Sequence, residues 1–337
     1  MTINPKLGRV PIWEDLPIHF RIDVVTYLDV KSKHRLLQCS KVDKFAVEKA
    51  PLVIRLLTIE ELPKKFLRKQ KYMFVNTEGD HTSVDAKVKR DEVAKKFMSI
   101  MLHRNSIMEK LSLKCNPKIP EKMIKAVHKA GIRVCWKVEA LKLRISVDHL
   151  IEFMSFFDRK YFKEVHLSVT GPRKKPKKSE NVDYSEVFSL LKDFKNLALL
   201  SIPEEIQGPL ECVSTARQLD YWATLIDPQD LANYVKGFQA NCSVGGSFFE
   251  ITTETIMNDK FWRDVVHCFD PIRVQLFHNP GRRETKVIAL KHQTEENSYI
   301  MFSYCSFAIY GGFVPNLSIE SFAEMIERRH IRFRAIF

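Results

Sequence analysis

The chain has 337 residues, 45% of them hydrophobic and 28% charged, with a formal net charge of +13. Its length exceeds the roughly 100–200 residues of an average domain and predicts two units, and its composition excludes a wholly disordered chain. No uncharged apolar run reaches about 18 residues, and Met1–Arg9 lacks an apolar signal core, so we expect neither a membrane span nor a secretion signal.

The N-terminal part of the chain predicts three short helices. Pro17 suits a first helical turn, and Ile18, Ile22 and Val25 follow at i, i+4 and i+7 on one face. Ser32 is a good N-cap for a second helix. A unit of roughly 40 residues is marginally stable alone and would gain from a partner. The expected helices are Pro17–Leu28, Lys33–Lys41 and Val42–Lys49.

The next stretch is basic and poorly periodic. We interpret it as a connection followed by a helix over Asp85–His103. Its expected inward-facing residues are Phe97, Ile100, Met101 and Leu102.

A weak repeat then begins, in which strand-like stretches carry the pattern L-x-L. Aligned on Leu111, Leu141, Val165, Leu197 and Leu219, they are spaced 30, 24, 32 and 22 residues apart. Amphipathic helical segments separate them, which favours parallel strands with helices on the outer side. The expected strands are 108–115, 138–145, 162–169, 195–202 and 216–223, and the expected helices are 120–130, 147–157, 184–194 and 227–238.

The C-terminal part departs from this repeat. Thr285–His292 and Ser298–Cys305 predict a hairpin, Ser318–Arg328 a helix and Ile331–Phe337 a last strand. The expected fold is therefore a mixed α+β or α/β chain: a three-helix unit (10–52), a basic connection and helix (53–95), and an irregular leucine-rich-repeat-like βα solenoid (96–337) with an antiparallel cap.

The N-terminal unit resembles the F-box. The ordered elements are a Leu-Pro pair, an apolar helix ending in Leu-Asp, then Ser and Leu, and a Cys-Ser-Lys end; Phe45 stands near the place of the family's common tryptophan. The residues that carry the resemblance are Leu16, Pro17, Ile22, Val24, Val25, Leu28, Asp29, Ser32, Arg35, Leu36, Cys39, Ser40 and Lys41.

The resemblance implies a non-catalytic adaptor subunit of a Skp–cullin–F-box ubiquitin ligase in the ubiquitin conjugation pathway. The F-box would bind the Skp adaptor, and through it a cullin, while the rest of the chain binds an unknown protein substrate. Alternatively, all the apolar residues concerned form the core of a small helical cap, because periodicity does not say which face is bound. The expected adaptor-binding residues are Leu16, Pro17, Ile22, Val25, Leu28, Leu36 and Cys39.

The remainder is similar to the F-box-associated region (FTH/DUF-type) of the nematode-expanded F-box families, through passages 103–113 and 156–168 and the terminal strands. If each L-x-L motif buries its leucines, the other residues of these strands face outward as a candidate substrate surface or as an ordinary solvated face. The expected substrate-binding residues are Lys114, Lys142, Arg144, His166 and Tyr221, with Ser112 and Ser168 beside them.

No motif predicts catalysis or a cofactor. The sequence has no G-x-S-x-G, H-E-x-x-H, G-x-x-x-x-G-K-[ST] or G-x-G-x-x-G, and the histidines lack metal-ligand spacing. Cys135 beside Trp136 is interpreted as a packing residue rather than a nucleophile. The seven cysteines form no C-x-x-C, so we expect neither a zinc ribbon nor a redox dithiol. Most of them sit beside apolar residues and are interpreted as small buried hydrophobes, which favours a reduced, intracellular protein of the cytoplasm or nucleus.

Two basic runs support a rival hypothesis from another class, a repeat scaffold that binds RNA or DNA. These runs are Lys64–Lys71 and Arg173–Lys178. They can equally be solvated loops or, for the second, a nuclear import signal, and neither has the interleaved aromatics of a single-strand platform. Strong salt dependence of binding would favour the nucleic-acid hypothesis.

Overall fold

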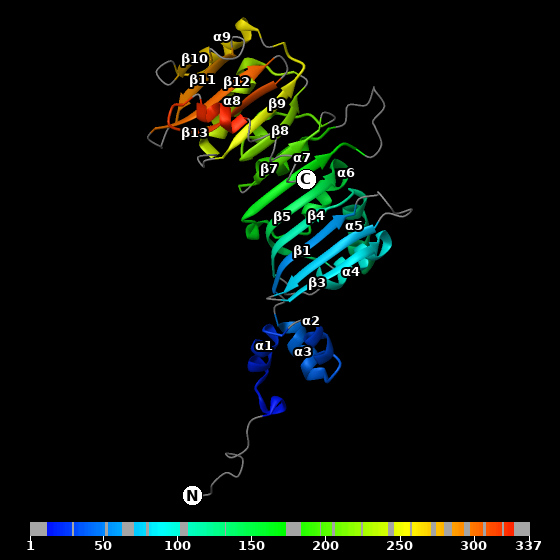
Figure 1. Ribbon diagram of the computed structural model, residues 1–337. Helices are drawn as coiled ribbons and strands as arrows, with labels where there is room; N and C mark the ends of the chain where they lie inside the picture. The colour runs from blue at the N-terminus through cyan, green and yellow to red at the C-terminus, as the bar shows by residue number, and fades with distance from the viewer. Residues whose placement is uncertain are drawn as a thin grey trace, which may run out of the picture. The chain divides into compact units, whose positions relative to one another are not determined.

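The computed structural model shows a mixed α/β chain with a large sheet (Figure 1). It describes residues 12–28, 30–50, 53–62, 71–78, 81–101, 107–131, 133–172, 183–195, 197–203, 206–223, 225–241, 246–256, 258–270, 274–279, 285–292, 297–305, 308–318 and 320–326. None of the helices in these ranges is long and apolar enough to cross a membrane.

The helices are α1 (Ile18–Thr26), α2 (Val30–Leu36), α3 (Lys41–Lys49), α4 (Arg90–Met101), α5 (Lys118–Ala130), α6 (Val147–Met154), α7 (Ser185–Lys192), α8 (Pro228–Asn241) and α9 (Asp259–His267). The strands are β1 (Val53–Glu61), β2 (Lys71–Glu78), β3 (His81–Lys89), β4 (Ile107–Lys114), β5 (Lys137–Ser146), β6 (Glu164–Thr170), β7 (Leu197–Ile202), β8 (Gln218–Ala223), β9 (Phe248–Thr253), β10 (Val274–Asn279), β11 (Thr285–Lys291), β12 (Ser298–Cys305) and β13 (Ala308–Pro315). Short 3₁₀ turns at Trp13–Asp15 (η1) and Leu210–Val213 (η4) matter below.

The chain divides into two compact units. Unit 1 comprises 1–113, 122–140 and 156–161, and unit 2 comprises 114–121, 141–155 and 162–337. Unit 1 holds α1–α4 and strands in the order β3-β2-β1-β4, followed by the first residues of β5. Unit 2 holds the rest of β5 and strands in the order β6-β7-β8-β9-β13-β12-β11-β10.

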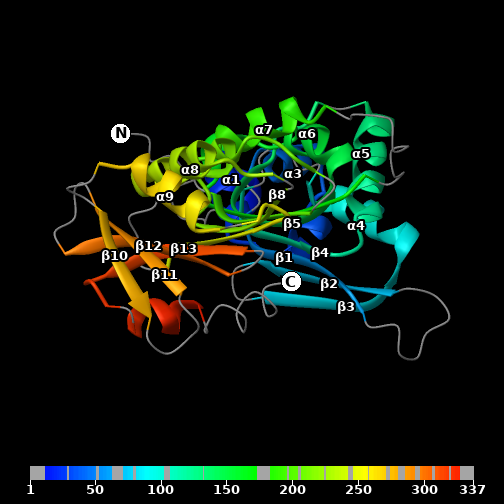
Figure 2. The same ribbon diagram turned by 90° about the horizontal axis from the view of Figure 1, so that it is seen from above.

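The five L-x-L stretches form strands β4 to β8, as the sequence predicts. Strands β6, β7, β8 and β9 pair in parallel, and Leu200 lies opposite Leu219. Both leucines are fully buried. In unit 2, helices α6, α7 and α8 lie on one face of these strands (Figure 2). Alternation therefore places Leu200 and Leu219 on one face of the sheet, and Ser201 and Asp220 on the opposite face. The solenoid geometry itself stays a prediction.

Two expectations in unit 1 are wrong. Residues 53–89 do not form a plain connection: β1 pairs with β2 and β2 with β3, both antiparallel. The helix expected from Asp85 begins only at Arg90, because residues 85–89 belong to β3, where Val88 lies opposite the fully buried Tyr72.

The second helix is also displaced from its expected position. α2 covers Val30–Leu36 rather than Lys33–Lys41, so Ser32 lies inside it and is not its N-cap. Ser40 instead caps α3, because its hydroxyl accepts a hydrogen bond from the Asp43 amide at 3.0 Å.

The C-terminal part is antiparallel, and the expected hairpin is present as β11 and β12. Strand β13, which the sequence analysis missed, pairs with both β12 and β9. Residues 320–326 are helical and bring the buried Phe322 onto Val287, Ala289, Met301 and Val314. The strand expected at 331–337 lies outside the described residues.

Gly311 in β13 lies between two phenylalanines, opposite Phe302 on β12 and Phe249 on β9. Both rings are fully buried, and a Cβ at position 311 would lie 2.2 Å from Cζ of Phe249. We expect Gly311→Ala to lower the free energy of unfolding by about 1–3 kcal/mol, because the core has no room for a methyl group. Urea unfolding checks this, and Phe249→Leu should relieve part of the cost in the double variant. Stabilisation by Gly311→Ala would contradict this packing.

Candidate functional site

Helices α1 and α3 enclose a small core of their own. Val25, Ala46, Val47 and Ala50 are buried at its centre. Around them pack Trp13, Ile22, Leu28, Leu36 and Leu37, which are partly buried. Four of the seven predicted adaptor-binding residues, Ile22, Val25, Leu28 and Leu36, therefore contribute to holding the helical unit together. Val25 is fully buried and offers no surface to a partner.

The other three predicted residues are more accessible. Pro17 is exposed at the N-cap of α1, Cys39 is exposed, and Leu16 is half-buried. The Leu16 carbonyl accepts a hydrogen bond from Nε of Arg21 at 2.9 Å, which fixes the chain where it enters α1. The seven residues are thus divided between an inner core and an outer surface.

An exposed apolar stripe runs along α1, on residues that the sequence analysis did not select as binding residues. Phe20, Val24 and Tyr27 recur at i, i+4 and i+7, and their side chains are 54%, 42% and 90% exposed. We call these three residues the outer stripe. α1 is thus apolar on two faces, one in the core and one in solvent. The helical unit exposes four more large apolar residues: Ile12, Ile18, Val42 and Phe45.

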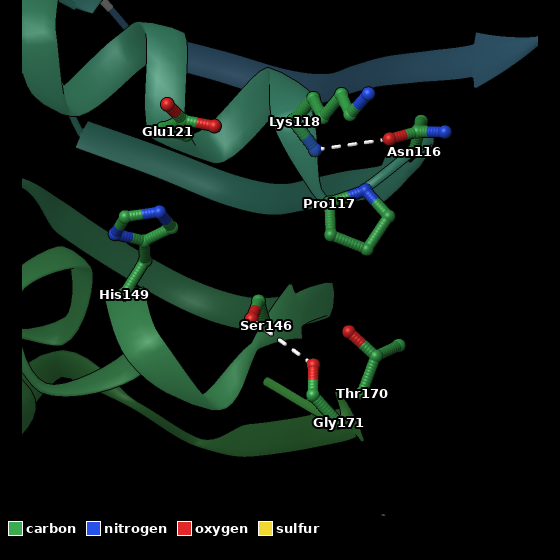
Figure 3. A pocket seen from close by; sticks show the side chains of 8 residues that line it. All are labelled: Asn116, Pro117, Lys118, Glu121, Ser146, His149, Thr170 and Gly171. Atoms are coloured by element: carbon green, nitrogen blue, oxygen red, sulfur yellow. Dashed lines mark hydrogen bonds between the residues drawn. The ribbon is translucent and has the colours of Figure 1, made fainter. Parts of the chain in front are cut away.

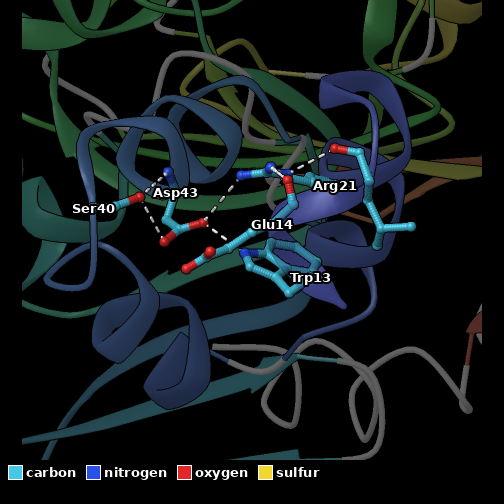
Figure 4. A network of polar contacts seen from close by, with 6 residues as sticks. Trp13, Glu14, Arg21, Ser40 and Asp43 are labelled. Atoms are coloured by element: carbon cyan, nitrogen blue, oxygen red, sulfur yellow. Dashed lines mark hydrogen bonds and ion pairs between the residues drawn. The ribbon is translucent and has the colours of Figure 1, made fainter. Parts of the chain in front are cut away.

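A polar network anchors η1 to α3 (Figure 4). Trp13 donates from its indole nitrogen to Oδ1 of Asp43 at 2.7 Å, and the Ser40 hydroxyl donates to Oδ2 at 2.7 Å. A guanidinium nitrogen of Arg21 lies 3.9 Å from the same carboxylate. The guanidinium also lies over the Trp13 ring, 5.7 Å from its centroid. One buried carboxylate therefore joins η1, α1 and the start of α3.

This network determines the protonation of Asp43. The hydrogen bond from Trp13 lowers the pKa of Asp43 most, and Ser40 and Arg21 lower it further. Burial acts in the opposite direction, yet the pKa stays below the ordinary value of 3.8.

The predicted substrate-binding residues occupy different environments. Arg144 is exposed on β5, whereas Lys114 and Lys142 are half-buried. His166 is 9% exposed, and its Nε2 contacts Oε1 of Glu164 on the same strand.

Tyr221 does not face outward as expected. It has the same parity as Leu219 on β8, is 1% exposed, and lies on the leucine side of the sheet. Its hydroxyl donates to the Gly208 carbonyl at 2.8 Å and accepts from the Gly208 amide at 3.0 Å. Burial raises the pKa of Tyr221 to about 12. The phenol is therefore a structural clamp on the segment before η4.

We expect Tyr221→Phe to lower the free energy of unfolding by about 1–3 kcal/mol, because the Gly208 amide and carbonyl both lose their partner. Tyr161→Phe is the control, since the Tyr161 side chain is 36% exposed and should be replaceable within about 0.5 kcal/mol. Urea unfolding of both variants measures the difference. Equal midpoints would contradict the clamp.

A groove of about 480 Å³ opens where β5 to β9 end. Three residues selected from sequence line it: Arg144, Ser168 and Tyr221. Ser201, Asp220, Trp222 and Thr252, which were not selected, line it as well. Register explains the grouping, because Ser168 lies opposite Ser201 and Ser201 opposite Asp220. This groove is the candidate partner-binding site.

A smaller hollow of about 180 Å³ lies in the loops at the starts of α5 and α6 (Figure 3). Glu121 and His149 line it from the two helices. The Ser146 hydroxyl donates to the Gly171 carbonyl at 3.2 Å, and the Lys118 amide donates to Oδ1 of Asn116 at 3.1 Å. These hydrogen bonds hold the loops that connect strand ends to the starts of α5 and α6. We therefore interpret the hollow as a structural feature of these loops.

Among the described residues, no group of three His, Cys, Asp or Glu side chains is arranged to hold a metal ion. Most of the first basic run (64–70) and all of the second (173–178) lie outside the described residues.

A comparison of the sequence with models of known protein families finds no match, and a comparison with curated proteins finds none either.

Proposed function

We propose that the chain is a non-catalytic substrate-recognition subunit of a Skp–cullin–F-box ubiquitin ligase. The α1–α3 unit binds the Skp adaptor, and the βα part holds a protein substrate. Such a subunit acts by raising the effective concentration of substrate near the transferring enzyme, and needs no reactive group of its own.

The observation that carries this proposal is the outer stripe of α1 with its exposed apolar neighbours. Seven large apolar side chains, from Ile12 to Phe45, are between 39% and 90% exposed within this one small unit. The three residues of the outer stripe are neighbours by their spacing along the helix, and an exposed apolar patch is typical of an interaction site. Aromatic residues dominate the binding energy of interfaces. These residues are additional to the buried cluster around Val25 that holds the helices together.

The helical unit also needs a partner on energetic grounds. Among its described residues, the buried apolar core consists of Val25, Ala46, Val47 and Ala50. Small cores give little stability, and a ligand that binds only the folded state adds to it. Burial of Phe20 and Tyr27 by the adaptor would supply the apolar contact that the unit itself lacks.

Co-purification of the full chain with a purified Skp adaptor tests the proposal. We expect a stoichiometric complex that survives gel filtration at physiological salt, since an apolar interface depends weakly on ionic strength. A folded chain that leaves the adaptor unbound would overturn it. In that case, titration of the same sample with RNA and DNA at increasing salt tests the nucleic-acid hypothesis.

A further inference from the structure

The groove at the ends of β5 to β9 carries opposite charges at its two ends. Arg144 on β5 provides a cation at one end. Asp220 on β8 provides an anion toward the other end, and its register partner on β9 is Glu250. Ser168 and Ser201 lie between them with neutral hydroxyls. The row across the strands is therefore cationic, neutral and acidic in turn.

Arg144 is available to a ligand. Its side chain is exposed, and it makes no hydrogen bond or ion pair with any residue that the structure describes. A guanidinium offers five donors in a planar fork that fits a carboxylate. At the other end Trp222 adds an aromatic surface beside Asp220, suited to the stem of a long basic side chain.

The spacing of the two charges follows from the sheet. Arg144 and Asp220 lie on strands three positions apart in the order β5-β6-β7-β8. At about 4.8 Å per strand, the separation across the sheet is about 14 Å. An extended peptide advances about 3.4 Å per residue, so about four residues span that distance.

We propose that this groove binds an extended peptide segment that carries an acidic residue and a basic residue about four positions apart. The acidic side chain pairs with Arg144, the intervening residues cross Ser168 and Ser201, and the basic side chain meets Asp220 beside Trp222. A uniform polyanion such as RNA is disfavoured, because it would bring a phosphate against Asp220. This inference deepens the proposed function by describing the segment of the substrate that is bound. It rests on the proposed function only in identifying the bound peptide as part of a ligase substrate.

The test is selection from a phage-displayed library of nine random residues on the purified full chain. We expect enriched peptides to carry Asp or Glu three to five positions from Lys or Arg. The Arg144→Glu variant should select peptides with basic residues at both charged positions. The Asp220→Lys variant should select peptides with acidic residues at both charged positions. Arg263→Glu, which alters an exposed arginine on α9 outside the groove, should leave the selection unchanged.

A synthetic peptide of the enriched sequence gives the magnitude. Arg144→Gln should weaken its binding about tenfold to hundredfold, the range for loss of one charge-assisted hydrogen-bonded pair. Three outcomes would overturn the proposal. They are no enrichment on a folded chain, selection of the same sequence by Arg144→Glu, and full displacement of the peptide by single-stranded RNA. All groove variants should bind the Skp adaptor like the unaltered chain. If the chain selects the expected peptides but does not bind the Skp adaptor, the proposed ligase function is wrong and the proposed peptide-binding groove stands.

Discussion

A chain carrying Phe20→Ala and Tyr27→Ala is expected to lose at least about a hundredfold in affinity for the Skp adaptor while keeping its unfolding transition. Truncation of a central aromatic residue of an interface costs about 2 kcal/mol or more, and the two losses together give at least this factor. Both side chains are largely exposed, so their removal takes little from the folded chain. Titration of labelled adaptor with each variant measures the loss.

Two control variants separate binding from folding. Leu225→Ala with Ile256→Ala removes apolar side chains that are 81% and 79% exposed in loops of unit 2, and should leave the affinity unchanged. Val25→Ala alters folding instead of the exposed surface, because it opens a cavity in the helical core. It should lower the free energy of unfolding by about 1–3 kcal/mol. It should weaken binding only by unfolding the unit. Unchanged affinity of the Phe20 and Tyr27 variant would remove the outer stripe from the interface.

The outer stripe also shows the limit of inference from the sequence of the helical unit. The resemblance selected Leu16, Pro17 and five others, but helical periodicity cannot distinguish a face that is buried in the chain from one that binds a partner. The structure divides them, with Val25 in the core and Pro17 at the surface. Phe20 could have been noticed, since its place with Val24 and Tyr27 makes α1 apolar on two faces.

The sheet was predictable wherever alternation was regular. The L-x-L stretches locate β4 to β8 because the apolar residues of each stretch are buried. β1 was missed because its buried residues, Ile54, Leu57 and Ile59, break the two-residue period once. Tyr221 was assigned to the wrong face although two residues separate it from Leu219, a spacing that places both on one side.

The groove could not be predicted from the residue pattern of any single strand, because its lining comes from several neighbouring strands. Arg144 and Ser168 could be selected because each flanks a buried leucine or valine. Ser201 and Asp220 join them only through the register of β6 with β7 and of β7 with β8. A sequence does not state that register, because a shift of two residues leaves every side chain on its own face.

Asp43→Ala is expected to destabilise the helical unit by about 2–4 kcal/mol. The substitution leaves the Trp13 indole N–H without its acceptor and removes the carboxylate beside Arg21. Amide hydrogen exchange in 18–49 should therefore accelerate by about two orders of magnitude, while the strands of unit 2 exchange as before. Asp23→Ala removes an exposed carboxylate from α1 and should change neither. Equal exchange in the Asp43 and Asp23 variants would contradict the anchoring role.

The effect of Asp43 should also depend on pH in a fixed direction. Because its pKa is lowered in the folded chain, the carboxylate holds protons less tightly there than in the unfolded chain. Its stabilising contribution is therefore complete above the unfolded pKa of about 3.9, and falls as the pH drops toward the lower folded value. The protection that Asp43 gives over Asp43→Asn should be constant from about pH 8 to pH 5 and shrink below about pH 4. If protection instead grew in acid, the carboxylate would be held protonated, and the hydrogen bonds from Trp13 and Ser40 could not be its main interactions.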